Sequence, residues 1–148
     1  MSEMTILLVE DDPNDELLTL RELRRQNVAH EIIIVRDGTE ALEYLFGTGK
    51  YDGRDPRDFP TLMLLDLKLP KIDGLEVLRR VRADKRTKMM PVVVLTSSDD
   101  QTDKIACYDL GANSYIRKPV DIDQFRKAVY QLHLYWMLLN EPPPKQVS

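Results

Sequence analysis

Five short apolar segments divide the chain, and the residues after each of them repeat apolar side chains at helical spacing. The first four segments consist almost entirely of Ile, Leu, Val and Met, which is typical of strands buried on both faces of a sheet. Parallel strands need long crossover connections, which are usually helices. The alternation therefore predicts a parallel sheet with helices on both faces. The predicted strands span residues 5–9, 32–35, 62–65, 92–95 and 114–116.

The order of these elements predicts one α/β domain. We expect a doubly wound, five-stranded parallel sheet in the strand order 2-1-3-4-5. Residues 47–60 are rich in Gly, Pro and charge and predict a long surface loop before the third strand. The domain is expected to cover residues 1–140, followed by a Pro-rich tail at 141–148. Helices are expected at about 13–27, around 41–45, at 75–83, from a cap at Asp99 or Asp100 to near Gly111, and at 122–139.

Composition restricts the class of protein. The 148 residues are 43% hydrophobic and 31% charged, as in packed globular domains. A net charge of -4 argues against binding to nucleic acid, and the apolar segments are too short to span a membrane. The single cysteine, Cys107, excludes an internal disulfide, and the first residues lack the features of a signal peptide. We therefore expect a cytoplasmic protein.

Side chains that can carry chemistry stand where the predicted strands end. Glu10 and Asp11 follow the first strand and Asp66 the third, whereas Thr96 and Lys118 follow the fourth and the fifth. In a doubly wound sheet these ends meet at one edge, where ligands bind. Three carboxylates repel one another unless a hard divalent cation lies among them, so the pattern predicts a Mg2+ site. The hydroxyl and ammonium groups would complete a pocket for a tetrahedral anion.

Four motifs in this order resemble the receiver domain of two-component response regulators, over residues from about 5 to 139. The resemblance implies a flavodoxin-like receiver fold in which Asp66 accepts a phosphoryl group from a sensor histidine kinase. It also implies that Asp11, Asp66 and the backbone carbonyl of Lys68 bind Mg2+, with Glu10 in the outer shell through water. The motifs are Glu10-Asp11, residues 65–74 (LDLKLPKIDG), residues 95–98 (LTSS) and residues 115–119 (YIRKP).

The same resemblance implies a switch. Thr96 would move toward the new phosphoryl oxygen, Tyr115 would rotate inward behind it, and Lys118 would pair with the phosphate. Such a protein is not an enzyme beyond catalysing its own phosphorylation and dephosphorylation. A stand-alone regulator of this length would signal through an unknown downstream protein. The Glu10-Asp11-Asp12 start, the long loop before the third strand and the Tyr135-Trp136 pair also resemble the stand-alone regulators that accompany bacterial phytochrome kinases. This second, less specific resemblance implies a phytochrome-type kinase as one option for the partner.

Two other functions compete with this interpretation. A haloacid-dehalogenase-type phosphatase needs a second Asp two residues after its nucleophile, and Lys68 occupies that position. A receiver-like binding module that acts without phosphorylation is the remaining alternative, although the intact set of site residues argues against it. Within the receiver family, a long cationic side chain at Lys68 predicts slow self-dephosphorylation.

Several other residues are interpreted as structural. Asp12 suits the cap of a helix that begins at Pro13, with Asp15 favoured by the helix dipole. His30, His133 and Cys107 receive no chemical role, and the glycines at 47–50 do not match a phosphate-binding loop. In the last predicted helix, a second apolar stripe adjoins the stripe expected to pack on the sheet, which predicts a homodimer through residues 122–139.

Overall fold

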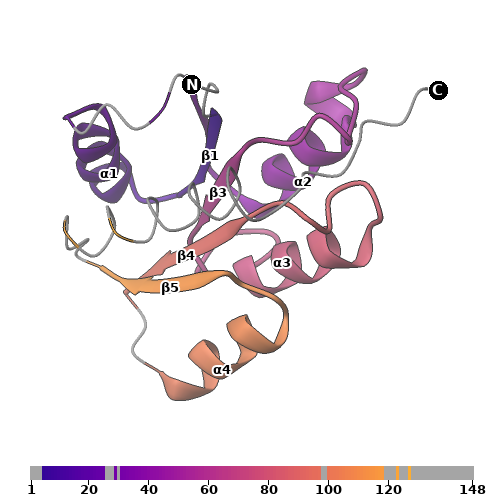
Figure 1. Cartoon of the computed structure of the whole chain (residues 1–148). Coiled ribbons are helices and arrows are strands. Elements are labelled where there is room, and N and C mark those ends of the chain that lie inside the picture. The colour runs from indigo at the N-terminus through magenta and orange to yellow at the C-terminus, as the bar shows by residue number, and fades with distance from the viewer. Residues whose placement is uncertain are drawn as a thin grey trace.

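A parallel five-stranded sheet forms the centre of the computed structural model, which describes residues 5–25, 29, 31–97, 100–118, 123 and 127. The strand order is β2-β1-β3-β4-β5, as predicted (Figure 1). The strands are β1 (Thr5–Val9), β2 (Glu31–Val35), β3 (Leu62–Leu65), β4 (Val92–Thr96) and β5 (Ser114–Arg117). The described helices are α1 (Pro13–Arg25), α2 (Gly38–Phe46), α3 (Gly74–Ala83), α4 (Gln101–Asp109) and the single 3-10 turn η1 (Gly49–Tyr51).

Alternation along the strands divides the buried side chains between two cores. In β1, Leu7 and Val9 face the core beneath α2, α3 and α4, whereas Ile6 and Leu8 face the core beneath α1. The strands β3 and β4 alternate in the same way, because successive side chains of a strand point to opposite faces. The described helices therefore lie on both sides of the sheet, with α1 on one face and the other three on the opposite face (Figure 1).

An aspartate caps the start of each of the four described α-helices. The Asp12 Oδ1 accepts hydrogen bonds from the backbone N–H of Asn14 at 2.8 Å and of Asp15 at 3.1 Å, as the sequence predicted. Of the two caps proposed for α4, Asp100 accepts a bond from the helix and Asp99 lies outside the described residues. The helix α3 begins at Gly74, one residue earlier than predicted. The remaining caps are Asp37 on α2 and Asp73 on α3. All four helices begin beside the carboxyl ends of the strands.

The predicted loop at 47–60 is more ordered than its composition suggests. It contains η1, and its Arg54 guanidinium donates to the carbonyls of Tyr44 and Asp58 and lies 3.8 Å from the centre of the Tyr44 ring. Gly47 ends α2 in the left-handed region, where a Cβ would lie 1.9 Å from the Arg54 carbonyl oxygen. The glycines here serve a helix end, in agreement with the rejection of a phosphate-binding loop.

Several predictions concern residues outside the described ranges. The last helix at 122–139, apart from residues 123 and 127, the homodimer interface assigned to it, His30, His133 and the tail at 141–148 all lie there. Cys107 is described and is buried in the core, consistent with a packing role. Among the described helices, none has the length and hydropathy required to cross a bilayer.

Arg82 of α3 holds together the two segments that lead into β4 and β5. These segments lie at the amino ends of the strands, opposite the edge where the capped helices begin. The Arg82 guanidinium donates to the backbone carbonyls of Lys88 at 3.0 Å, Met90 at 2.6 Å and Gly111 at 3.0 Å. It also donates to the Asn113 side-chain oxygen at 3.1 Å, which in turn accepts from the backbone of β4. One side chain therefore satisfies acceptors from two segments that are distant in sequence.

We predict that Arg82→Met lowers the free energy of unfolding by about 2 kcal/mol, because the part-buried carbonyl of Met90 and three exposed acceptors lose their donor together. Urea unfolding followed by circular dichroism measures this loss. Arg79→Met is the matched control, since Arg79 lies on the same helix but its partner Glu76 is on the surface. An equal loss in the two variants would contradict the role assigned to Arg82.

Candidate functional site

Three carboxylates meet at the carboxyl ends of β1 and β3, as the sequence predicted. Oxygen atoms of Glu10, Asp11 and Asp66 all lie within 4.8 Å of one another, in an arrangement that can hold a metal ion. Glu10 and Asp66 are buried, whereas Asp11 is exposed to solvent. Oxygen donors of this kind, open to water on one side, fit a hard divalent cation.

Backbone contacts fix the two buried carboxylates at this edge. The Glu10 N–H donates to the carbonyl of Val35 in β2, and the Asp66 N–H donates to the carbonyl of Val9 in β1, each at 3.1 Å. The loop after Asp66 turns back closely, since a Cβ at Gly74 would lie 2.3 Å from the Asp66 carbonyl oxygen. Only glycine permits this approach, so Gly74 helps to place the loop that carries Lys68.

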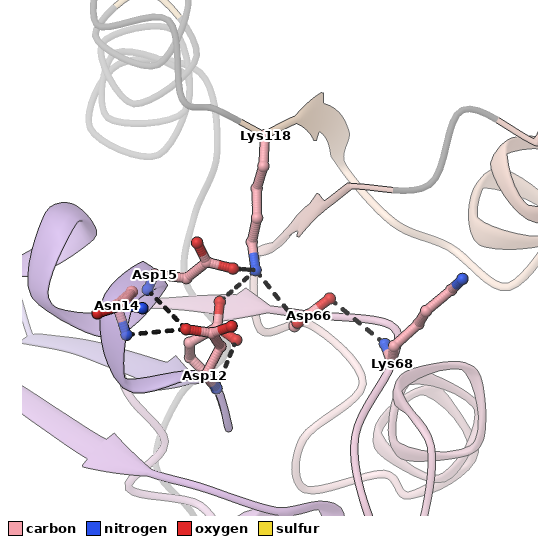
Figure 2. A network of polar contacts seen from close by, with 7 residues as sticks. Asp12, Asn14, Asp15, Asp66, Lys68 and Lys118 are labelled. Atoms are coloured by element: carbon pink, nitrogen blue, oxygen red, sulfur yellow. Dashed lines mark hydrogen bonds and ion pairs between the residues drawn. The ribbon is translucent and has the colours of Figure 1, made fainter.

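Lys118 reaches the carboxylates from the end of β5 (Figure 2). Its ammonium group donates to Glu10, to Asp15 at 2.9 Å and to Asp66 at 3.2 Å. Its backbone N–H donates to the Thr96 carbonyl at 2.8 Å, which ties the residue to β4. The predicted convergence of Asp66 and Lys118 is therefore present in the structure.

Burial and mutual charge perturb this group of residues. Burial raises the pKa of Glu10 to about 7, and the Asp66 carboxylate adds to the rise, against the hydrogen bond from Lys118. Burial acts to lower the pKa of Lys118, but its hydrogen bonds to Glu10 and Asp15 and the charges around it raise that pKa above its ordinary value. Lys118 is therefore a permanent cation in this site, and burial opposes the ionisation of Glu10.

Sequence reasoning missed Asp15 as a member of the site. It assigned Asp15 only to the first turn of α1, where the structure also finds it, but the side chain additionally contacts Lys118. The signal was the short distance in sequence between Glu10 and the start of α1 at Pro13, which places the first turn of the helix beside the strand end. Asp12, by contrast, is a helix cap as predicted.

The remaining predicted site residues are placed but their roles are not tested by the geometry. Thr96 is fully buried at the end of β4, and Tyr115 on β5 packs against the core beneath α2, α3 and α4. The Lys68 backbone N–H donates to Asp66 at 3.3 Å, and its exposed side chain extends away from Lys118 (Figure 2). The switch of Thr96 and Tyr115 and the Lys68 carbonyl ligand stay predictions.

Comparison with known proteins identifies the family that carries this site. The family model of the response regulator receiver domain matches residues 6–130 of the chain. This chain belongs to the response regulator receiver family. The receiver resemblance that the sequence motifs carried is thereby confirmed, together with the fold class.

Individual relatives add the phytochrome-associated resemblance. The response regulator Rcp1 of Synechocystis sp. is 42% identical over 132 residues, which cover 89% of this chain and 88% of Rcp1. The solved structure of the bacteriophytochrome response regulator RtBRR is 48% identical with a TM-score of 0.81, over 97% of this chain and 86% of RtBRR.

Two further solved structures bear on ligands of the family. The Mn2+-bound form of Rcp1 is 39% identical with a TM-score of 0.75, over 95% of this chain and 99% of that one. The phosphorylated cyanobacterial phytochrome response regulator RcpA is 38% identical with a TM-score of 0.76, over 97% and 100% of the two chains. Together with the acidic cluster of this chain, they point to a site for a divalent cation.

The raised pKa of Glu10 predicts a specific pH dependence of stability in the absence of divalent cations. Between about pH 4.5 and pH 7 the folded protein keeps a proton on Glu10 that the unfolded chain releases, so stability falls as the pH rises. We expect a loss of about 1 to 2 kcal/mol over this range, because water at the open side of the site screens part of the effect.

Urea unfolding in the presence of EDTA measures this dependence. Glu10→Gln is the matched variant, because it keeps the shape of the side chain and removes the titration. The stability difference between wild type and variant should shift in favour of the variant as the pH rises from 4.5 to 7. A difference that stays constant over this range would refute the assignment to Glu10.

Proposed function

We propose that this protein is a stand-alone response regulator that accepts a phosphoryl group on Asp66 from a histidine kinase, with Mg2+ as the cofactor. The observation that supports this most is the meeting of Asp66 with Glu10, Asp11 and Lys118 at one edge of a receiver sheet. Family membership and the likeness to phosphorylated RcpA agree with it. The alternative, a receiver-like module that binds its partner without phosphorylation, has no specific observation in its favour.

The chemistry assigns a role to each residue. An Asp66 oxygen attacks the phosphorus of a phosphohistidine, the P–N bond breaks, and an acyl phosphate forms on Asp66. Asp11, Asp66 and the Lys68 carbonyl would hold the cation directly, with Glu10 acting through water. When bound, Mg2+ would neutralise charge on the phosphoryl oxygens. Lys118, held at the site as a cation, would pair with one of those oxygens.

The proposed switch follows phosphorylation. The Thr96 hydroxyl would bind a phosphoryl oxygen, and Tyr115 would turn toward the space behind it. Thr96 is buried at the end of β4, where it pairs with Arg117, and Tyr115 pairs with Val94, so the two residues lie on adjacent paired strands. In this proposal the protein catalyses no reaction beyond its own phosphorylation and dephosphorylation.

The proposed partners follow from the relatives. The likeness to the bacteriophytochrome response regulator RtBRR and to the cyanobacterial phytochrome response regulator RcpA supports a phytochrome-type kinase as the phosphoryl donor. The cytoplasmic location rests on the sequence alone and is part of the proposal. The downstream protein is unknown. A homodimer through residues 122–139 rests on the sequence pattern and remains part of the proposal.

Incubation with Mg2+ and acetyl phosphate, followed by intact-mass measurement, tests the phosphoacceptor. We expect one phosphoryl adduct on the wild type and none on Asp66→Asn. Asp12→Asn is the matched control and should keep the adduct, because Asn caps a helix as well as Asp does. A wild type that takes no phosphoryl group under these conditions would instead support the module that acts without phosphorylation.

Lys68 is predicted to prolong the life of the acyl phosphate. Its exposed, flexible side chain lies two residues from Asp66 and can shield the phosphoryl group from water or pair with it. We expect Lys68→Asn to shorten the half-life of phosphorylated Asp66 several-fold, measured by loss of the adduct after the donor is removed.

Lys71→Asn is the control for this prediction. Lys71 lies in the same loop with a positive φ of 69°, a conformation that Asn tolerates, so both variants lose one positive charge without new strain. The control should leave the half-life unchanged. Equal half-lives for wild type and Lys68→Asn would sink the prediction.

A further inference from the structure

Among the described residues, three carboxylates accept hydrogen bonds from the Lys118 ammonium group, and the proposed chemistry gives no role to that of Asp15. Its carboxylate accepts a hydrogen bond from the ammonium group at 2.9 Å, shorter than the 3.2 Å contact with Asp66. The Asp15 side chain is 36% exposed, whereas those of Asp66 and Glu10 are 10% and 2% exposed. Lys118 is thus held on one side by the buried strand ends and on the other by a helix at the surface.

The helix gives Asp15 a fixed position relative to the site. Its backbone N–H donates to the cap residue Asp12, and the Asp12 N–H donates to Glu10 at 3.2 Å. The first turn of α1 is therefore hydrogen-bonded to the strand end that carries Glu10. Movement of the helix would break these bonds, so Asp15 and Lys118 separate by rotation of the Asp15 side chain or by movement of Lys118.

The donors of Lys118 are fully used in this arrangement. An ammonium group has three N–H donors, and Glu10, Asp15 and Asp66 each accept from it. Lys118 can bind a phosphoryl oxygen only after it releases one of these carboxylates. In the proposed reaction Asp66 itself becomes the acyl phosphate, which frees one donor of Lys118 for a phosphoryl oxygen. Asp15, at the surface, remains as a carboxylate that competes with the phosphoryl group for the ammonium group.

The excess of negative charge at this edge also opposes the phosphorylated state. With Asp11 included, four carboxylates lie at this edge beside one ammonium group, and phosphorylation adds a further negative charge. We propose that Asp15 is a positioning residue that retains Lys118 in the unphosphorylated protein and opposes its transfer to the phosphoryl group. This inference rests on the proposed function. Asp15 thereby sets the equilibrium between the resting state and the phosphorylated state.

The matched substitution is Asp15→Asn, which keeps an oxygen that can accept from Lys118 and removes the negative charge. The phosphorylated state should gain stability, because Lys118 leaves a neutral amide more easily than a carboxylate. We expect the affinity for beryllofluoride, a stable mimic of the phosphoryl group, to rise about three- to tenfold in the presence of Mg2+. Fluorine NMR or calorimetric titration measures this affinity.

Two further variants separate this role from a general effect of charge or structure. Glu16→Gln removes the neighbouring charge on α1, where the carboxylate pairs with Arg36 at 2.9 Å instead of with Lys118. It should leave the affinity for beryllofluoride unchanged. In a Lys118→Met background, Asp15→Asn should no longer change that affinity. Unchanged or weaker binding by Asp15→Asn, or an effect that persists without Lys118, would overturn the proposal.

Failure of the proposed function gives a different result. If the wild type binds no beryllofluoride and takes no phosphoryl group from acetyl phosphate, the phosphoacceptor assignment fails. The retention of Lys118 is then decided by urea unfolding of the metal-free protein. Asp15→Asn should be more destabilising with Lys118 present than in the Lys118→Met background, and equal effects in the two backgrounds would overturn the retaining contact.

Discussion

The ammonium group of Lys118 compensates for a crowding of negative charge that the sheet itself creates. Parallel strands in the order 2-1-3-4-5 bring the ends of β1, β3 and β5 to one edge, so Glu10 and Asp66 become neighbours. Burying carboxylates without a counter-charge would cost several kcal/mol. The contacts of Lys118 with the strand ends and with α1 reduce this cost.

The fold could be predicted from sequence because its signals are local and repeated. Buried parallel strands are short, apolar runs, and each of the first four is followed by an aspartate-capped helix, so order and handedness leave few topologies. The ordering of the 47–60 segment and the hydrogen bonds of Arg82 could not be predicted. Both depend on a guanidinium group that donates hydrogen bonds to carbonyls of residues distant in sequence, and no local sequence pattern predicts such bonds.

The candidate site was predicted to the extent that it depends on strand ends. Glu10, Asp11, Asp66 and Lys118 lie at such ends, and the topology alone brings them together. Asp15 was missed because it belongs to a helix, where an acidic residue in the first turn already has a sufficient explanation. Its contact with Lys118 depends on how α1 packs against the sheet, and the sequence pattern does not encode that packing.

The aspartate caps have an electrostatic consequence for the whole edge. All four described α-helices begin beside the carboxyl ends of the strands, so the positive ends of four macrodipoles lie at the edge of the sheet that carries the acidic cluster. Each capping aspartate neutralises part of this positive charge. The part that is left makes the electrostatic potential at this edge less negative for an approaching dianion. An edge so rich in aspartate is therefore less repulsive to anions than a count of its formal charges suggests.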